Sequence, residues 1–278
     1  MTSYNINKFA VIGAGNMGSG IAQKIATEGF KVVLVDLDDE KVARGIGTIK
    51  AMLDQAVKRK VFLPAQADAI LANIDGTSDW SKLSDVDLVI EAVFENMDVK
   101  KSVFSRLSEI CKPTCILGTN TSSFLVKELV DSVSNPERLV GLHYFFHPAK
   151  NRLVEVIGHA TTSDDVYRAA WASQEAIGKT PIYSADAPGF VVNRYFVPWV
   201  NEGVRLLGED VANIATIEWA AKKAFNVGMG PFELMNVTGV PISFHAATSL
   251  GDQLGDFYYP GQALKNFCET GGVSWPLE

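Results

Sequence analysis

Short apolar runs alternate with amphipathic stretches along the first two thirds of the chain. Two of these stretches, residues 18–28 and 99–110, repeat apolar residues at the spacing of one helix face. The runs between them are apolar at nearly every position, which is typical of strands buried on both faces in a parallel sheet. The predicted strands are residues 9–12, 31–35, 87–93, 115–118, 139–142, 153–157 and 181–183.

The strand pattern stops at an Asp-Ala-Pro-Gly sequence at residues 186–189. Beyond it the apolar spacing is that of helices, which are separated by Gly and Pro breaks such as Gly-Met-Gly-Pro at 228–231. The predicted helices are residues 192–207, 214–225 and about 241–253.

This organisation predicts an α/β protein with a Rossmann-type doubly wound sheet and a second, smaller all-helical domain. The sheet domain should cover residues 1–186, with a helical excursion at about 45–72, and the helical domain residues 187–278.

The first predicted strand runs directly into Gly-Ala-Gly-Asn-Met-Gly, which opens the first amphipathic stretch. Gly13 permits a tight turn, Gly15 lets the backbone approach a pyrophosphate, and Gly18 lets the helix lie close to the sheet. The N–H groups and positive end of that helix attract the pyrophosphate. The motif indicates a dinucleotide site, with a flavin site or a glycine turn that binds no nucleotide as alternatives.

The second predicted strand ends at Asp36. A carboxylate at this point accepts hydrogen bonds from the ribose hydroxyls and repels a 2′-phosphate. The next residues are Leu37, Asp38 and Asp39, with no arginine to bind such a phosphate. The sequence therefore predicts NAD rather than NADP.

Three polar clusters lie at the ends of other predicted strands, at residues 91–95, 119–123 and His143. Because ligands of open α/β sheets bind beyond the carboxyl ends of the strands, we expect these clusters to converge on one crevice. Glu91 is either structural or turned toward the cofactor. Ser122 is either a turn residue or a hydrogen-bond donor to a substrate.

Glu155 lies inside the apolar run at residues 153–157. An unpaired carboxylate there would cost several kcal/mol of desolvation, so it needs a partner. Arg152 is adjacent in the chain and points to the opposite face of a strand. His143 closes the preceding strand, and a histidine held by a carboxylate is typical of a general base. The alternative is a structural pair, and His147 and His159, like His245, are weaker candidates.

Composition narrows the function further. The net charge of −7 leaves no basic field for nucleic acid or an anionic membrane. The three cysteines are too few and too scattered for a disulfide framework, and no metal site is expected. The longest apolar tract, residues 190–200, is interrupted by polar residues and proline, and residues 1–8 are polar, so the expected location is the cytoplasm.

Two local features remain open. The basic run Lys58-Arg59-Lys60 is either a solvated helix face or a contact for an anionic ligand. Asn193, at the start of the first helix after the domain boundary, satisfies its amide either through local structure or through a ligand.

With these residues identified, the chain resembles the L-3-hydroxyacyl-CoA dehydrogenases along nearly all its length. The resemblance implies interconversion of (3S)-3-hydroxyacyl-CoA and 3-oxoacyl-CoA with NAD. It implies His143 as the base, Glu155 as its orienting carboxylate, and Ser122 and Asn193 as contacts of the reacting end of the substrate. The segments that carry the resemblance are residues 11–18, 89–96, 119–123, 141–143, 153–157, 188–194 and 229–234.

The resemblance also places Lys58, Arg59 and Lys60 near the phosphates of CoA. Apolar residues at helical spacing over 192–207, more than one small domain needs, predict a homodimer through the helical domain. The expected NAD-binding residues are Gly13, Gly15, Asn16, Met17, Gly18, Asp36, Ala92, Glu95, Lys100 and Asn120.

The chain departs from the family pattern in two places. Phe146-His147 stands where the family commonly has Asn-Pro, which predicts an altered acyl pocket or nicotinamide environment. The chain ends at residues 275–278 without the usual Gly- and Lys-rich segment. The alternatives are a lambda-crystallin-like L-gulonate 3-dehydrogenase and an NAD-binding protein without turnover.

Overall fold

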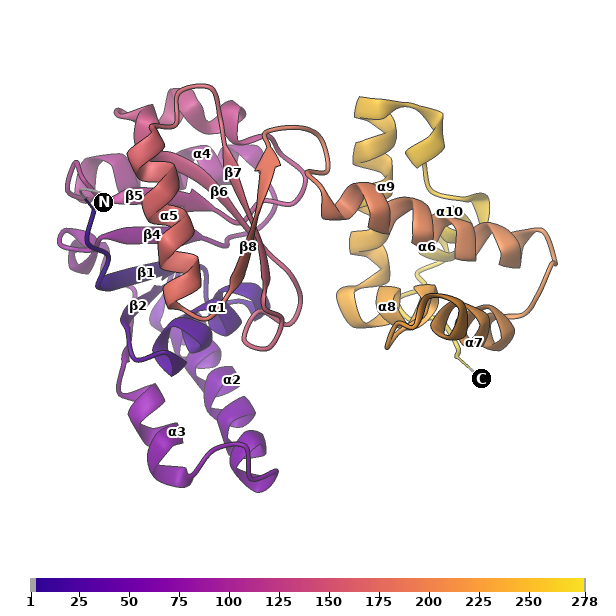
Figure 1. Ribbon diagram of the computed structural model, residues 1–278, viewed down its shortest axis with the longest axis horizontal. Coiled ribbons are helices and arrows are strands. Elements are labelled where there is room, and N and C mark those ends of the chain that lie inside the picture. Colours follow the sequence, from indigo (N-terminus) through magenta and orange to yellow (C-terminus); the bar gives the residue numbers. More distant parts are fainter. Residues whose placement is uncertain (1–3, 278) are drawn as a thin grey trace. The chain divides into compact units, whose positions relative to one another are not determined.

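A computed structural model describes residues 4–277 (Figure 1). The first three residues of the polar N-terminal stretch and the terminal Glu278 lie outside the described residues. The chain divides into two compact units, Met1–Asp186 and Ala187–Glu278. Between residues 4 and 277, no helix combines the length and apolar character needed to cross a membrane.

The first unit is built on one eight-stranded sheet with the order β3-β2-β1-β4-β5-β6-β7-β8. Strand order reverses between β1 and β4, the point at which doubly wound sheets bind their ligands. The strands are β1 (Lys8–Ile12), β2 (Lys31–Val35), β3 (Ile74–Thr77), β4 (Leu88–Glu91), β5 (Ile116–Thr119), β6 (Leu139–Tyr144), β7 (Leu153–Gly158) and β8 (Thr180–Ala185).

Helices of the first unit pack on this sheet through apolar faces. Ile21 and Ile25 of α1 share one buried core with Val166 and Ala170 of α5 and with the strands. The pair α2 and α3 extends beyond the sheet and accounts for the predicted helical excursion (purple in Figure 1). The helices are α1 (Asn16–Thr27), α2 (Asp39–Lys58), α3 (Pro64–Leu71), α4 (Met97–Ile110) and α5 (Asp164–Ala176).

The prediction of a parallel sheet is correct for the strands from β1 to β6 and wrong for β7, which runs antiparallel to β6. The connection between them, residues 145–152, is too short for the crossover of about a dozen residues that a parallel pair requires. Strand β3 was not predicted, because its sequence Ile-Asp-Gly-Thr contains one apolar residue and lies half exposed at the sheet edge.

The second unit is all helical, as predicted. Its core includes Val204, Phe232 and Trp275. The predicted helices correspond to α6, α7 and α9, whereas α8 and α10 were missed because each is only eight residues long, too short for a clear periodic pattern. The helices are α6 (Val192–Gly208), α7 (Ile214–Phe225), α8 (Pro231–Thr238), α9 (Val240–Leu254) and α10 (Gln262–Glu269).

A buried carboxylate fixes the junction between α7 and α8. Glu218 of α7 accepts hydrogen bonds from the backbone N–H groups of Gly230, Phe232 and Glu233 at 3.1, 2.5 and 3.2 Å. These groups form the N-terminus of α8, where a negative charge is favourable. A Cβ atom at Gly230 would lie 2.5 Å from a Glu218 oxygen, so any side chain there would displace the carboxylate.

Candidate active site

The glycine turn between β1 and α1 has two glycines that the protein itself requires. Gly13 has a φ of +103°, and a Cβ there would lie 2.5 Å from the Ala92 carbonyl oxygen. A Cβ at Gly18 would lie 1.8 Å from the Gly13 carbonyl oxygen. By contrast, a Cβ at Gly15 would meet nothing within 4 Å. Close approach of a pyrophosphate to the helix N-terminus explains a glycine there, so the turn fits a dinucleotide.

Asp36 follows the end of β2 and faces this turn. Its Oδ2 accepts the Ala14 N–H and its Oδ1 accepts the Leu37 N–H, both at 2.7 Å. Each carboxylate oxygen has a second lone pair, which can accept a ribose hydroxyl. The geometry therefore fits the ribose of NAD.

Glu91, Glu95 and Lys100 form a carboxylate–lysine cluster beyond the end of β4. The Lys100 ammonium lies 2.8 Å from Glu91 Oε1 and 3.0 Å from Glu95 Oε2. The side chains of Lys100 and Glu91 are 1% and 0% exposed, and that of Glu95 is 25% exposed. Glu91 also accepts hydrogen bonds from the Val93 N–H and the Thr119 hydroxyl. The cluster thus ties the end of β4 to α4 and to β5.

Glu95 in turn holds the loop that follows β5. Its Oε1 accepts the Thr121 hydroxyl at 2.5 Å and the N–H groups of Ser122 and Ser123 at 3.0 Å. Burial acts to raise the pKa of Glu95, but the Lys100 charge and these hydrogen bonds outweigh it and hold the pKa below its usual value. Glu95 is therefore an ionised anchor for the backbone at Ser122.

A further hydrogen bond extends the crevice to β6, where the Asn120 side-chain oxygen accepts the Tyr144 N–H at 2.8 Å. The three polar clusters expected at the strand ends are therefore held together: Glu91 by Thr119, Glu95 by Ser122, and Asn120 by the residue after His143.

His143 and Glu155 are directly opposite each other in the antiparallel register of β6 and β7. His143 Nδ1 lies 2.6 Å from Glu155 Oε2, and the two residues are 5% and 0% exposed. Because a carboxylate only accepts hydrogen bonds, Nδ1 donates to it, and in the neutral imidazole Nε2 then carries the lone pair that a general base needs. The Phe145 ring packs edge-on against the imidazole, with 4.6 Å between the ring centroids. Arg152 is exposed, so the predicted partner of Glu155 is the histidine.

The loop after Tyr144 is held by a lysine that no sequence motif indicates. Lys179, 4% exposed at the start of β8, donates to the carbonyl oxygens of Pro148 and, at 2.7 Å, Asn151. Burial, together with the nearby Lys24 charge, lowers the pKa of Lys179 to about 7. Where the family commonly has proline, His147 places its Nε2 2.7 Å from the Met52 sulfur of α2.

The remaining predicted site residues are on α2 and α6. Lys58, Arg59 and Lys60 are exposed at the end of α2. Asn193 is the second residue of α6, in the helical unit, and is half-buried. Their contacts with ligands remain predictions.

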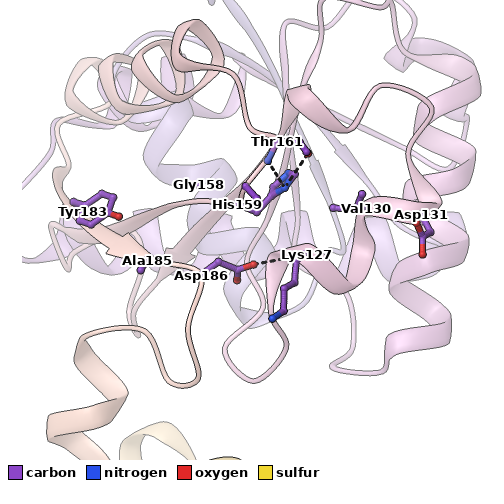
Figure 2. Close-up of a pocket in the computed structure, with 10 residues that line it drawn as sticks. Lys127, Val130, Asp131, Gly158, His159, Thr161, Tyr183, Ala185 and Asp186 are labelled. Atoms are coloured by element: carbon purple, nitrogen blue, oxygen red, sulfur yellow. Dashed lines mark hydrogen bonds between the residues drawn. The ribbon is translucent and has the colours of Figure 1, made fainter.

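A separate hollow of about 470 Å³ is lined by residues of the short helix η2 (Val126–Ser132) and of the carboxyl ends of β7 and β8 (Figure 2). His159 lies in it, between the Pro136 carbonyl at 3.1 Å and the Thr161 hydroxyl at 3.2 Å. Burial lowers the pKa of His159, so it stays neutral and structural. Because β7 is antiparallel to β6, its carboxyl end lies beside the amino end of β6. The hollow is therefore at the opposite ends of the strands from His143.

A glycine turn against a helix N-terminus, a ribose-facing carboxylate and a histidine–carboxylate pair define a Rossmann-type, NAD-dependent dehydrogenase. Residues 8–187 match the family model described as 3-hydroxyacyl-CoA dehydrogenase, NAD binding domain. Residues 189–274 match 3-hydroxyacyl-CoA dehydrogenase, C-terminal domain. The chain belongs to the 3-hydroxyacyl-CoA dehydrogenase family, and its cofactor is NAD.

Individual relatives agree with this assignment. A 3-hydroxybutyryl-CoA dehydrogenase of Clostridioides difficile is 35% identical, with 92% of each chain covered. One from Bradyrhizobium diazoefficiens is 34% identical, with 96% of this chain and 91% of the relative covered. The crystal structure of an (S)-3-hydroxybutyryl-CoA dehydrogenase from Ralstonia eutropha superposes with a TM-score of 0.91 at 33% identity, covering 97% of this chain and 96% of that one.

Lys179 should make stability depend on pH. Its pKa is about 7 in the fold against an ordinary value of 10.5, so above pH 7 the unfolded chain holds a proton that the folded chain has released. Stability then rises with pH by about 1 kcal/mol per unit between roughly pH 7 and 9. Urea unfolding of the wild type and Lys179→Met should show a difference in free energy that grows over this range.

The exposed Lys150→Met, in the same loop, is the matched control and should follow the wild type. A difference between wild type and Lys179→Met that stays constant from pH 6 to 9 would contradict the lowered pKa.

Proposed function

We propose that the protein oxidises (3S)-3-hydroxyacyl-CoA to 3-oxoacyl-CoA, and catalyses the reverse reaction when NADH is in excess. The observation that carries the proposal is the buried His143–Glu155 pair, joined by a 2.6 Å hydrogen bond at the carboxyl end of β6. Membership of the 3-hydroxyacyl-CoA dehydrogenase family supports the substrate class. NAD, when bound, accepts the hydride that leaves C3 of the substrate.

The protein supplies a base and a fixed orientation. His143 Nε2 takes the proton of the 3-hydroxyl group, and Glu155 stabilises the resulting imidazolium while holding the ring through Nδ1. Removal of the proton makes the oxygen electron-rich, which favours departure of the hydride from the same carbon. The pair is almost fully buried, so its electrostatic interaction is weakly screened.

Ser122 is proposed to hold the substrate oxygen. Glu95 fixes the Ser122 backbone through the N–H group, so the loop that carries the hydroxyl has a defined position. The family resemblance assigns Asn193 to the same end of the substrate, and this assignment is part of the proposal.

Substrate class can be tested by steady-state kinetics with acetoacetyl-CoA and NADH, compared with L-gulonate and NAD. Turnover of acetoacetyl-CoA with little activity on L-gulonate supports the proposal. Preference for L-gulonate would point to the sugar-acid alternative. NADH binding without turnover of either would indicate a protein that binds NAD and lacks catalysis. A kcat/KM series over acyl-CoA lengths then gives the chain-length preference.

The dyad predicts large and coupled losses of kcat. General-base catalysis contributes roughly 10²- to 10⁴-fold, so His143→Gln should lose about that much in kcat while still binding NADH. Glu155→Gln keeps the shape but removes the charge that stabilises the imidazolium, so it should also lower kcat. The double variant should lose less than the product of the two single losses, because the residues act as a unit.

Protonation of the base should slow alcohol oxidation in the wild type as the pH falls, and His143→Gln should lack this dependence. A purely structural pair would instead lower the unfolding midpoint and leave turnover per folded molecule unchanged. Near-wild-type kcat in folded His143→Gln would end the proposed mechanism.

The basic run is proposed to bind the phosphates of CoA. Lys58 and Lys60 are exposed at the end of α2, as expected for contacts with a charged ligand. Charge reversal in Lys58→Glu with Lys60→Glu should raise KM for acyl-CoA and reduce its salt dependence, because screened contacts are lost. NADH affinity, measured by fluorescence titration, should stay unchanged. Equal weakening of NADH binding would refute this placement.

We propose a homodimer formed through the helical unit. Val200 and Val204 of α6 are not available for such an interface, because they are buried in the core of their own unit. Other large apolar side chains support it better, since Tyr195, Trp219 and Phe257 are 77%, 65% and 69% exposed. Light scattering at micromolar concentration should give twice the 30.2 kDa of one chain. A stable, active monomer would contradict the proposal.

The cytoplasm is the proposed location.

A further inference from the structure

The carboxylate–lysine cluster contains one more carboxylate than ion pairing requires. Lys100 balances the charge of Glu95, and that pair alone would be neutral. Glu91 adds a second negative group, and its side chain is 0% exposed. Burying that carboxylate costs several kcal/mol of desolvation, which its hydrogen-bond and ion-pair partners must offset. With one lysine between two carboxylates, the cluster has a net charge of −1. This excess charge calls for an explanation beyond holding α4 to the sheet.

The proposed role of Ser122 places the cluster near the nicotinamide end of the cofactor. Glu95 binds the backbone of Ser122, which the proposed function places at the substrate oxygen. The nicotinamide must lie next to the carbon bearing that oxygen, because the hydride passes directly between them. The β4 loop also faces the glycine turn, since a Cβ at Gly13 would lie 2.5 Å from the Ala92 carbonyl oxygen. The cluster is therefore close to the part of NAD whose charge changes during the reaction.

We propose that Glu91 is a positioning residue that sets the balance between the two redox states of the bound cofactor. The oxidised nicotinamide ring is cationic and the reduced ring is neutral, so a net negative cluster stabilises NAD⁺ relative to NADH. Glu91 acts through Lys100, which it holds against Glu95, and through the charge it adds. The inference rests on the proposed placement of Ser122, and it concerns cofactor binding rather than turnover.

Glu91→Gln provides the direct test, because it removes one charge and keeps the size and hydrogen-bonding capacity of the side chain. The dissociation constants of NAD⁺ and NADH would be measured for the full chain by calorimetry at pH 8, without acyl-CoA. The ratio of the NAD⁺ constant to the NADH constant should rise by roughly fivefold to tenfold, as expected for one charge lost from a weakly screened cluster.

Variants of Lys100 should change this ratio in the opposite direction, and they also provide a charge-matched control. Lys100→Met makes the cluster more negative, so the ratio should fall below the wild-type value. The double variant Glu91→Gln, Lys100→Met leaves only the charge of Glu95, so the ratio should return toward the wild type. Thr119→Val removes a hydrogen bond to Glu91 without changing any charge, and the ratio should not move.

A purely structural role predicts a different pattern, in which each variant weakens NAD⁺ and NADH equally and the double variant is worst. That result, or a double variant whose ratio fails to return, would overturn the inference. Wild-type protein that binds neither cofactor would refute the cofactor site itself, which is a separate failure.

Discussion

The carboxylate of Glu155 has no solvent exposure, and its need for a partner constrains much of the first unit. Only a strand running antiparallel to β6 brings His143 directly opposite it in the register observed. The connection, residues 145–152, is too short for a parallel crossover and forms the loop that follows the strand of His143. Lys179 then fixes this loop by its carbonyl oxygens. The buried pair therefore depends on the direction of β7 and on the register that places the two residues opposite each other.

The helix N-termini show how an acidic chain can bind an anionic cofactor. Side-chain oxygens of Asp38, Asn96, Ser163 and Asn213 cap α2, α4, α5 and α7. Helix α1 has Gly15 at its N-cap position, and no side chain caps it. Its N–H groups and dipole are therefore available to a pyrophosphate, and no excess of basic residues is needed.

Much of the site was predictable because it is encoded in short segments at strand ends. The glycine turn, Asp36 and the pairing of His143 with Glu155 follow from a local motif or from the cost of burying one carboxylate. Lys179 was not predictable, because only tertiary packing shows that its amine is buried against carbonyl groups. The role of Glu91 could not be predicted either, because it depends on an ion pair with Lys100, which is on helix α4.

Limits on the fold prediction have the same origin. Strand β3 contains one apolar residue and exists because β2 offers it an edge, which no local pattern records. The direction of β7 was overlooked because an apolar run looks alike in parallel and antiparallel strands. In the helical unit, the apolar spacing of α6 suggested an interface with a second copy. Val200 and Val204 instead fill the core of their own unit.

Burial of Lys179 has a chemical consequence for an enzyme that handles thioesters. A lysine with a pKa of about 7 is an uncharged amine in about half of the molecules at neutral pH, and uncharged amines attack acyl groups. At 4% exposure, however, the nitrogen is shielded by the carbonyl groups of the loop it supports. The packing therefore protects the most nucleophilic form of this side chain from acylation by the protein's own substrate class.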